Sequence, residues 1–216
     1  MDTIALHDEL EKVLGKYTAE PLSFCGLDYG ELYISEKNKY NTVSITDEGK
    51  ALCGRHLELL SDCVLRKPGY VAARKFVASG ESGKASVYKL ALGGDEIAVK
   101  EHKVVNDHDQ LQRYSEARLV IRDFENVTVP TAFFSHTGCG GPFGSIMAME
   151  YVDGARDLES IRIESQSKYD ELYIAMMESG APLKLLEAGI EVPKPDDVMV
   201  KRDERTGAPK FSIVDL

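Results

Sequence analysis

Three short segments with alternating polar and apolar residues follow one another between residues 75 and 102, and each gap between them holds glycine. The segments are Lys75–Ala78, Ser86–Leu92 and Glu96–His102. Alternation with a period of two is typical of strands with one buried face. Gaps this short allow only antiparallel connections, since parallel strands need a long crossover. The pattern therefore predicts an antiparallel sheet that begins near Lys75.

A helix and two more strands are predicted to complete this sheet. From about Asp107 to Phe124 the apolar residues recur at helical spacing along one face. Further strands are predicted at Thr131–Ser135 and Ser145–Met149, on either side of a glycine-rich turn. For the rest of the chain we predict a short element at Leu158–Ile161 and one helical stretch over residues 168–186. A hairpin formed by Val198–Val200 and Phe211–Val214 is predicted after them. We expect an α+β fold.

The composition excludes some classes of function. The net charge of the 216 residues is −10, and an acidic chain is a poor general binder of nucleic acid, which needs a basic face. The first residues do not form a signal peptide, and no apolar run reaches the length of a membrane span. The cysteines (Cys25, Cys53, Cys63 and Cys139) lack C-x-x-C spacing, so we expect buried free thiols and a cytoplasmic protein.

The first third of the chain predicts a helix, a hairpin and a second helix. The expected helix Thr3–Tyr17 is amphipathic, and two short strands follow at Leu32–Ser35 and Asn41–Ile45. Thr46 is the expected N-cap of a helix that extends to about Val64. Arg66-Lys67-Pro68-Gly69 breaks the pattern, so we expect a boundary there. The predicted parts are an extension over residues 1–68, a sheet domain over 69–152 and a third part over 153–216.

Four residues have the spacing that a clamp for nucleotide phosphates requires. Gly80 and Gly83 lie between two predicted strands, where the lack of a Cβ lets backbone N–H groups approach phosphate oxygens. Lys100 ends the next strand but one, and Glu116, on the predicted helix, would hold that lysine in place. Asp109 and Asp123 are alternatives to Glu116 that are less well placed. A surface lysine and a solvated acidic helix face are the simpler interpretations of Lys100 and Glu116.

The same glycine run also resembles a Walker A loop. However, Ala78 replaces the first glycine of that motif, and Ala85 replaces its magnesium-binding Ser/Thr. A Walker A loop also needs a helix after its lysine, whereas residues 86–90 alternate like a strand. We therefore favour a glycine-rich turn between strands.

Two runs near the end of the chain carry carboxylates beside apolar residues. They are Lys194-Pro195-Asp196-Asp197-Val198-Met199-Val200 and Ile213-Val214-Asp215-Leu216. Together with the glycine turn, Lys100, Glu116 and the run Ser145–Val152, these segments resemble the protein-kinase superfamily, both eukaryotic-like and RIO-like. The resemblance covers residues 75–216. It implies a bilobal kinase-like fold with a five-stranded small lobe, a hinge at Met149–Val152, a metal-binding hairpin and a truncated large lobe.

The resemblance also implies a set of site residues and two cofactors, ATP and Mg²⁺. Lys100, Glu116, Asp197 and Asp215 are the implied catalytic residues, and Asp197 and Asp215 are the implied metal ligands. The residues implied to contact ATP are Val77, Gly80, Gly83, Val87, Ala98, Lys100, Met149, Glu150, Val152 and Met199.

The sequence departs from the family where the chemistry should occur. Glu191-Val192-Pro193 stands where the family has His/Tyr-Arg/Gly-Asp, and Val192 falls near the place of the catalytic base. The sequence ends at Leu216, before the segment that would bind a protein substrate in that family, so we expect either a fragment of a longer gene product or a chain that binds nucleotide without ordinary phosphotransfer. The expected function is therefore ATP binding in a protein-kinase-like phosphotransferase, of Ser/Thr type if active, with weak or no activity in this form. The alternatives are a pseudokinase that binds an unidentified protein partner, and a small-molecule kinase.

The hairpin and helix before residue 68 are similar to the wing and last helix of winged-helix domains, which some RIO-type kinases carry ahead of the catalytic part. The segment is short for a full winged helix, and it is acidic. We therefore favour a helical cap that packs on the next domain.

Overall fold

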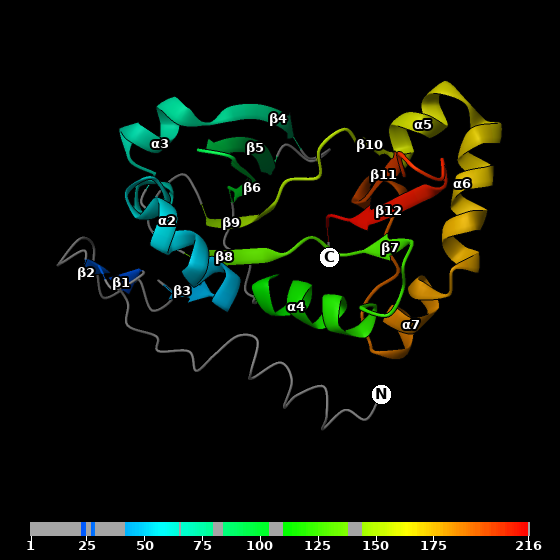
Figure 1. Cartoon of the computed structure of the whole chain (residues 1–216), viewed down its shortest axis with the longest axis horizontal. Coiled ribbons are helices and arrows are strands. Elements are labelled where there is room, and N and C mark those ends of the chain that lie inside the picture. The colour runs from blue at the N-terminus through cyan, green and yellow to red at the C-terminus, as the bar shows by residue number, and fades with distance from the viewer. Residues whose placement is uncertain are drawn as a thin grey trace. The chain divides into compact units, whose positions relative to one another are not determined.

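The computed structural model describes residues 23–24, 27–28, 42–64, 66–79, 84–103, 110–137 and 144–215 (Figure 1). Within them the chain has an α+β fold with six α-helices and a six-stranded antiparallel sheet. The contacts between Cα atoms divide the chain into two compact units. We call residues 11–112 and 132–151 the sheet unit, and residues 1–10, 113–131 and 152–216 the helical unit.

The sheet unit is built on six antiparallel strands in the order β3-β8-β9-β6-β5-β4. Each of the six strands was predicted as an element to within two residues at each end, but the predicted sheet had five strands. The sixth is β3, which was expected in a hairpin of the N-terminal extension. The alternation is strong because one face packs on helices. The bounds are β3 Thr42–Ile45, β4 Lys75–Ser79, β5 Ala85–Leu92, β6 Asp95–His102, β8 Ala132–Thr137 and β9 Ser145–Glu150. A separate two-stranded pair, β1 Ser23–Phe24 with β2 Leu27–Asp28, was not predicted.

The core of the sheet unit lies between the sheet and two helices, α2 (Asp47–Val64) and α3 (Pro68–Ala73). Burial of apolar side chains on both sides of this layer stabilises it. The core residues are Leu52, Cys53, Leu60, Cys63, Val64, Tyr70, Leu90, Leu92, Ile97, Val99, Phe134, Ile146 and Ala148.

Thr46 is the N-cap of α2, as the sequence predicts. Its hydroxyl oxygen accepts a hydrogen bond from the backbone N–H of Gly49 over 3.1 Å, which satisfies a donor that the first helical turn leaves open. The same hydroxyl donates to the carbonyl oxygen of Ala132 over 2.9 Å. The cap therefore fixes both the start of α2 and its place against β8.

Arg66 and Lys67 lie between two helices, since α2 ends at Val64 and α3 begins at Pro68, whereas Pro68 and Gly69 of the predicted break are the first residues of α3. Proline is favoured at this first helical position because its missing N–H is not needed there. Both helices nevertheless contribute to the core of the sheet unit. Residues 47–64 therefore share a core with the sheet and do not form a separate one. The predicted helix Thr3–Tyr17 and the predicted strand Leu32–Ser35 lie outside the described residues.

The helical unit contains a four-stranded sheet in the order β10-β11-β12-β7. The predicted hairpin is confirmed as β11 (Val198–Arg202) and β12 (Pro209–Ile213). β10 (Arg156–Asp157) pairs antiparallel with β11, and β7 (Val127–Thr128) pairs parallel with β12.

The helices of this unit are shorter than the sequence predicts. The stretch predicted as one helix over residues 168–186 forms two, α6 (Gln166–Glu178) and α7 (Ala181–Glu187). Gly180 separates them with a φ of 81°, which few residues other than glycine adopt. α5 (Leu158–Glu164) precedes α6, and a 3₁₀ turn, η1 (Pro195–Asp197), leads into β11.

The helix predicted over Asp107–Phe124 is observed as α4 (Gln110–Val120). Its apolar positions Leu111, Tyr114, Ala117 and Ile121 are buried, as the periodicity predicts. The chain leaves the helix before Phe124, which is half-buried.

The cysteine prediction is confirmed for one described residue and wrong for another. Cys63 is a buried free thiol, whereas Cys53 is disulfide-bonded. Spacing along the sequence did not indicate a pair because a disulfide joins residues that the fold brings together. In the part of the chain that the structure describes, no helix is long and apolar enough to span a bilayer.

Candidate functional site

Lys100 is a buried cation in the middle of the six-stranded sheet. Its strand, β6, lies between β5 and β9, and Lys100 stands opposite Val87 on one neighbour and Met147 on the other. The residue is only 6% exposed. Lysine is almost never this buried without a partner, and Lys100 does interact with other groups. A buried lysine on a central strand is not the surface lysine of the simpler interpretation.

The face of the sheet that carries Lys100 holds buried apolar side chains on one side of it and the buried His102 on the other. Side chains two apart on a strand share a face, so Ala98 lies beside Lys100, and it stands opposite Met149 on β9. Ala98 and Met149 are both buried. Val87, opposite Lys100, is half-buried. Four residues predicted to contact ATP, including Lys100, therefore lie on one face, opposite the face that packs on α2 and α3.

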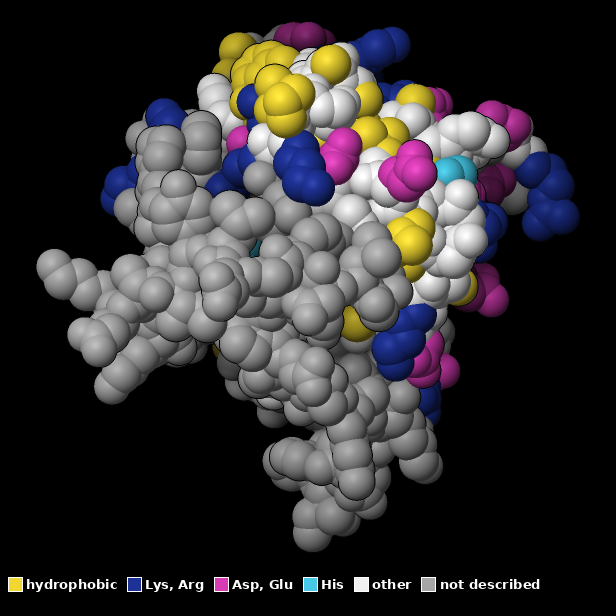
Figure 2. Space-filling model, turned by 90° about the vertical axis from the view of Figure 1, so that its left-hand side faces the viewer, with side chains coloured by type: hydrophobic (Ala, Val, Ile, Leu, Met, Phe, Trp, Pro, Cys, Tyr) yellow, Lys and Arg dark blue, Asp and Glu magenta, His cyan; other side chains and the backbone are white. Residues whose placement is uncertain are grey.

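Val77 lies at the edge of this sheet. It occupies an irregularity in the pairing of β4 with β5, between Phe76 and Ala78. Val77 is 44% exposed. Figure 2 shows hydrophobic side chains gathered at the top of the view, where α3 and β4 lie; the exposed ones on these elements include Val71, Phe76 and Val77.

A group that the sequence did not suggest borders the Lys100 face at the end of β9. Lys89 stands opposite Ala98, and its ammonium group lies 2.7 Å from the carboxylate of Glu96. The same ammonium group lies 4.4 Å from the centre of the Tyr151 ring, within the range of a cation–π interaction. Glu150, just before Tyr151, is exposed. The sequence did not indicate a role for Lys89, because lysines are common on the solvent-facing side of a strand that has one polar face.

The helical unit brings the two predicted metal ligands together. Val198 and Ile213 face each other at the open end of the β11–β12 hairpin. The next pair continues the ladder, since the N–H of Val214 donates to the carbonyl oxygen of Asp197. Asp197 and Asp215 therefore lie at the same end of the hairpin.

The charges of the two acids affect each other. Burial raises the pKa of Asp197 to about 6, with added repulsion from Asp215 and Asp196, while a hydrogen bond from the N–H of Lys194 lowers it. The bond from Lys194 spans 3.0 Å. Carboxylate oxygens are ligands that Mg²⁺ accepts, commonly one or two of them in a site.

Tyr114 lies beside this pair and was predicted only as a core residue. Its hydroxyl donates to the carbonyl oxygen of Val214. Burial, and then the charges of Asp215 and Asp197, raise the pKa of Tyr114 well above its usual range. The neutral phenol therefore stays a hydrogen-bond donor and holds the chain next to Asp215.

The remaining predicted residues divide as follows. Glu116 is half-buried on α4, within the part of that helix that belongs to the helical unit. Met199, on β11, and Val152 are half-buried residues of the same unit. Gly80 and Gly83 lie outside the described residues.

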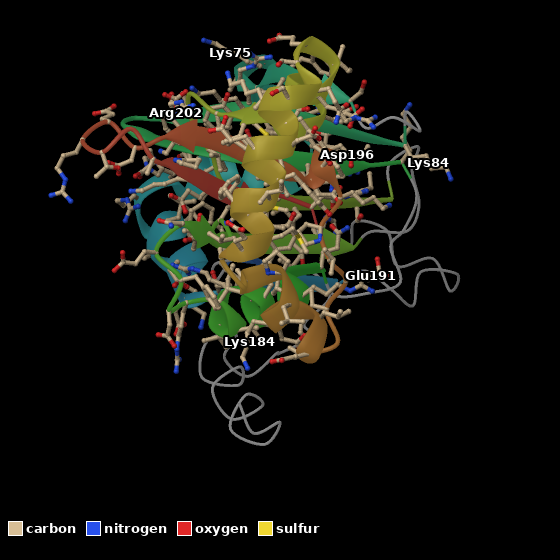
Figure 3. The ribbon with its side chains drawn as sticks, turned by 90° about the vertical axis from the view of Figure 1, so that its right-hand side faces the viewer. Lys75, Lys84, Lys184, Glu191, Asp196 and Arg202 are labelled. Atoms are coloured by element: carbon tan, nitrogen blue, oxygen red, sulfur yellow. The ribbon has the colours of Figure 1, made fainter. Side chains whose placement is uncertain are left out.

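The segment in the place of the catalytic loop holds no base at the expected position. Val192 is half-buried and Pro193 is buried. Glu191 and Asp196, the two nearby acids, are both exposed (Figure 3). No set of three or more His, Cys, Asp or Glu side chains among the described residues is arranged to hold a metal, so Asp197 and Asp215 would need phosphate or water to complete a coordination shell.

No protein-family model matches this sequence, and no curated protein is significantly similar to it. Assignment of a function therefore depends on the geometry of the Lys100 face and of the Asp197–Asp215 pair.

Proposed function

We propose that this chain binds ATP as a protein-kinase-like phosphotransferase with weak or no transfer activity in this form. One observation carries the proposal: Lys100 is buried on the central strand of the sheet, on a face shared with the apolar Ala98 and Met149. A buried cation beside apolar side chains suits a ligand with a flat base and a phosphate chain. The apolar side chains would hold adenine, and Lys100 would contact the phosphates.

We propose that Asp197 and Asp215 bind the Mg²⁺ that accompanies the nucleotide. Mg²⁺ keeps several waters and is commonly held by one or two carboxylates together with substrate phosphates. The pair satisfies this requirement, since both acids lie at one end of the hairpin and interact electrostatically.

The proposed hinge coincides with a feature of the chain. The resemblance places the hinge at Met149–Val152, and the chain passes from the sheet unit to the helical unit between Tyr151 and Val152. We therefore infer that the six-stranded sheet belongs to a kinase-like small lobe, extended at its edge by β3, and that residues 153–216 are part of a large lobe.

The proposal is tested by thermal unfolding with increasing Mg·ATP. A ligand that binds only the folded state raises the unfolding temperature by mass action. We expect the wild-type chain to be stabilised and Lys100→Ala to lose this response. Lys50→Ala removes an exposed positive charge from α2 and should keep the response. A folded wild-type chain, verified by circular dichroism, whose unfolding temperature does not change with Mg·ATP would refute ATP binding.

The second candidate is a protein-binding module of the pseudokinase type. The helical unit exposes large hydrophobic side chains on α5, α6 and α7, which would offer apolar contact area to a partner protein. They are Ile163 at 79%, Ile174 at 54%, Met177 at 39%, Leu183 at 59% and Leu186 at 55% exposed. Together with the absence of a base at Val192, they favour a role in binding a partner protein.

A further inference from the structure

Glu101, the residue after Lys100, is a buried carboxylate on the opposite face of β6. Successive side chains on a strand point to opposite faces. Lys100 stands opposite Val87 and Met147, and Glu101 stands opposite Ser86 and Ile146. Glu101 is 4% exposed, and a buried carboxylate is costly unless charged or polar groups compensate it.

The compensating groups come from α3 and the residue that follows it. The Tyr70 hydroxyl donates to Oε1 of Glu101 over 2.7 Å, and the Arg74 guanidinium donates to the same oxygen. Arg74 also lies 4.0 Å above the ring of Tyr88 and 5.3 Å from that of Tyr70. We call Tyr70, Arg74, Tyr88 and Glu101 the Glu101 anchor.

The Glu101 anchor fixes β6 next to the proposed phosphate ligand. Hydrogen bonds from charged donors to a carboxylate are stronger than neutral ones, and a fully partnered buried network is rigid. Because Lys100 and Glu101 are adjacent, the anchor restrains the same stretch of backbone that sets the direction of the Lys100 side chain. Near the start of β6, the ion pair of Lys89 and Glu96 is more exposed, at 24% and 40%, and such pairs contribute little.

We propose that Glu101 is a positioning residue for Lys100, and that α3 acts through it to set the affinity for nucleotide phosphates. This inference depends on the proposed function, because it assumes that Lys100 contacts phosphate. It adds a role for residues 70–74, which have no part in the kinase resemblance: they hold the phosphate-binding lysine from behind the sheet.

The test compares the affinities for ATP and for adenosine, which shares the base and lacks the phosphates. A residue that acts through Lys100 affects only the ligand with phosphates, whereas general loosening of the sheet affects both. Glu101→Gln removes the charge and keeps the size. Tyr70→Phe is the milder variant, since it removes one hydrogen bond and keeps the ring. The control is Leu92→Ala, a truncation in the same core at the far end of β5.

We expect Glu101→Gln to bind ATP about tenfold more weakly and to bind adenosine within about twofold of the wild type. Tyr70→Phe should change the ATP affinity in the same direction by less. Leu92→Ala should lower the unfolding temperature and leave the ratio of the two affinities unchanged.

The inference would be overturned if Glu101→Gln and Tyr70→Phe weakened the affinities for ATP and adenosine equally, or if they changed neither affinity. Either result would leave the proposal of ATP binding intact. If Glu101→Gln does not fold, the ratio of the ATP and adenosine affinities of Tyr70→Phe tests the inference by itself. A wild-type chain that binds neither ligand, or binds ATP no better than adenosine, would instead refute the role of Lys100 in phosphate binding, and the inference with it.

Discussion

The N–H of Val214 donates to the carbonyl oxygen of Asp197 over 2.7 Å, and this bond adds a step to the β11–β12 ladder beyond its last strand pair. Asp197 precedes the first residue of β11, and Asp215 follows Val214. The bond therefore keeps the two acids close despite their repulsion. Carboxylates with a raised pKa occur often at functional sites, and this supports the proposed Mg²⁺ site.

Asp197→Asn should stabilise the ligand-free protein at pH 7.5. The pKa of Asp197 is raised to about 6, chiefly by burial, so the folded state holds this proton more tightly than the unfolded state. The resulting cost is present above about pH 6 and absent below about pH 4. Asparagine removes the charge and can still accept the Lys194 hydrogen bond. We expect a gain of about 1 kcal/mol at pH 7.5 and almost none at pH 4, measured by urea unfolding in EDTA.

The same variant should lose Mg²⁺ binding, which isothermal titration in the presence of a nucleotide would detect. Stabilisation at pH 7.5 together with loss of Mg²⁺ binding is the expected combination for a metal ligand. Asp203→Asn is the comparison. This substitution also removes an acidic side chain near the hairpin. Asp203 pairs with Lys210 at 2.6 Å. We therefore expect Asp203→Asn to give no stabilisation and to leave Mg²⁺ binding unaffected. Full Mg²⁺ affinity in Asp197→Asn would exclude this carboxylate as a ligand.

Gly49→Ala should destabilise the protein, whereas Gly54→Ala in the same helix should not. A Cβ at Gly49 would lie 2.1 Å from the carbonyl oxygen of Phe133, and a Cβ at Gly54 would meet nothing within 4 Å. Overpacking against backbone costs ~1–3 kcal/mol, and alanine at an open helical site gains ~0.5–1 kcal/mol. Chemical unfolding of the two variants measures both effects. Equal stabilities would mean that α2 can move away from β8.

His136→Asn should reduce the loss of stability at acid pH. Burial lowers the pKa of His136 to about 4, although its bond to the Val64 carbonyl oxygen opposes this change. The unfolded state therefore takes up this proton first, and stability falls as the pH drops from about 6.5 to about 4. Between pH 7 and pH 4.5, the free energy of unfolding should fall by about 2 to 3 kcal/mol more in the wild type than in the variant. Urea unfolding at the two pH values gives the difference, and parallel losses in the two proteins would contradict it.

The strands were predictable from the sequence because local patterns define them. Residues 86–102 alternate, and Gly93 and Gly94 have φ values of 54° and 120°, which few other residues adopt. The turn and both strands of the β5–β6 hairpin are therefore contained in one short segment. The same holds for the β11–β12 hairpin, which is why the neighbourhood of Asp197 and Asp215 could be predicted.

Features that depend on distant parts of the chain could not be predicted. Glu101 contacts Tyr70 across 31 positions of sequence, and no local pattern in the sequence links the two residues. The division of α6 from α7 depends on a single glycine, which is often tolerated within helices. The expected ion pair of Lys100 with Glu116 stays a prediction.

Transfer of phosphate to a generic protein substrate should be very weak or absent. Val192 stands near the place of the base, and the acids on either side of it, Glu191 and Asp196, are exposed. Loss of a general base typically costs ~10²–10⁴-fold in rate, and poor positioning of the substrate costs more. An assay with radiolabelled ATP measures this directly, with Asp215→Ala as the control for contaminating kinases. Rapid turnover that Asp215→Ala abolishes would instead identify an active enzyme. Glu191→Gln and Asp196→Asn would then show which exposed carboxylate replaces the base, since only the variant without it should lose activity.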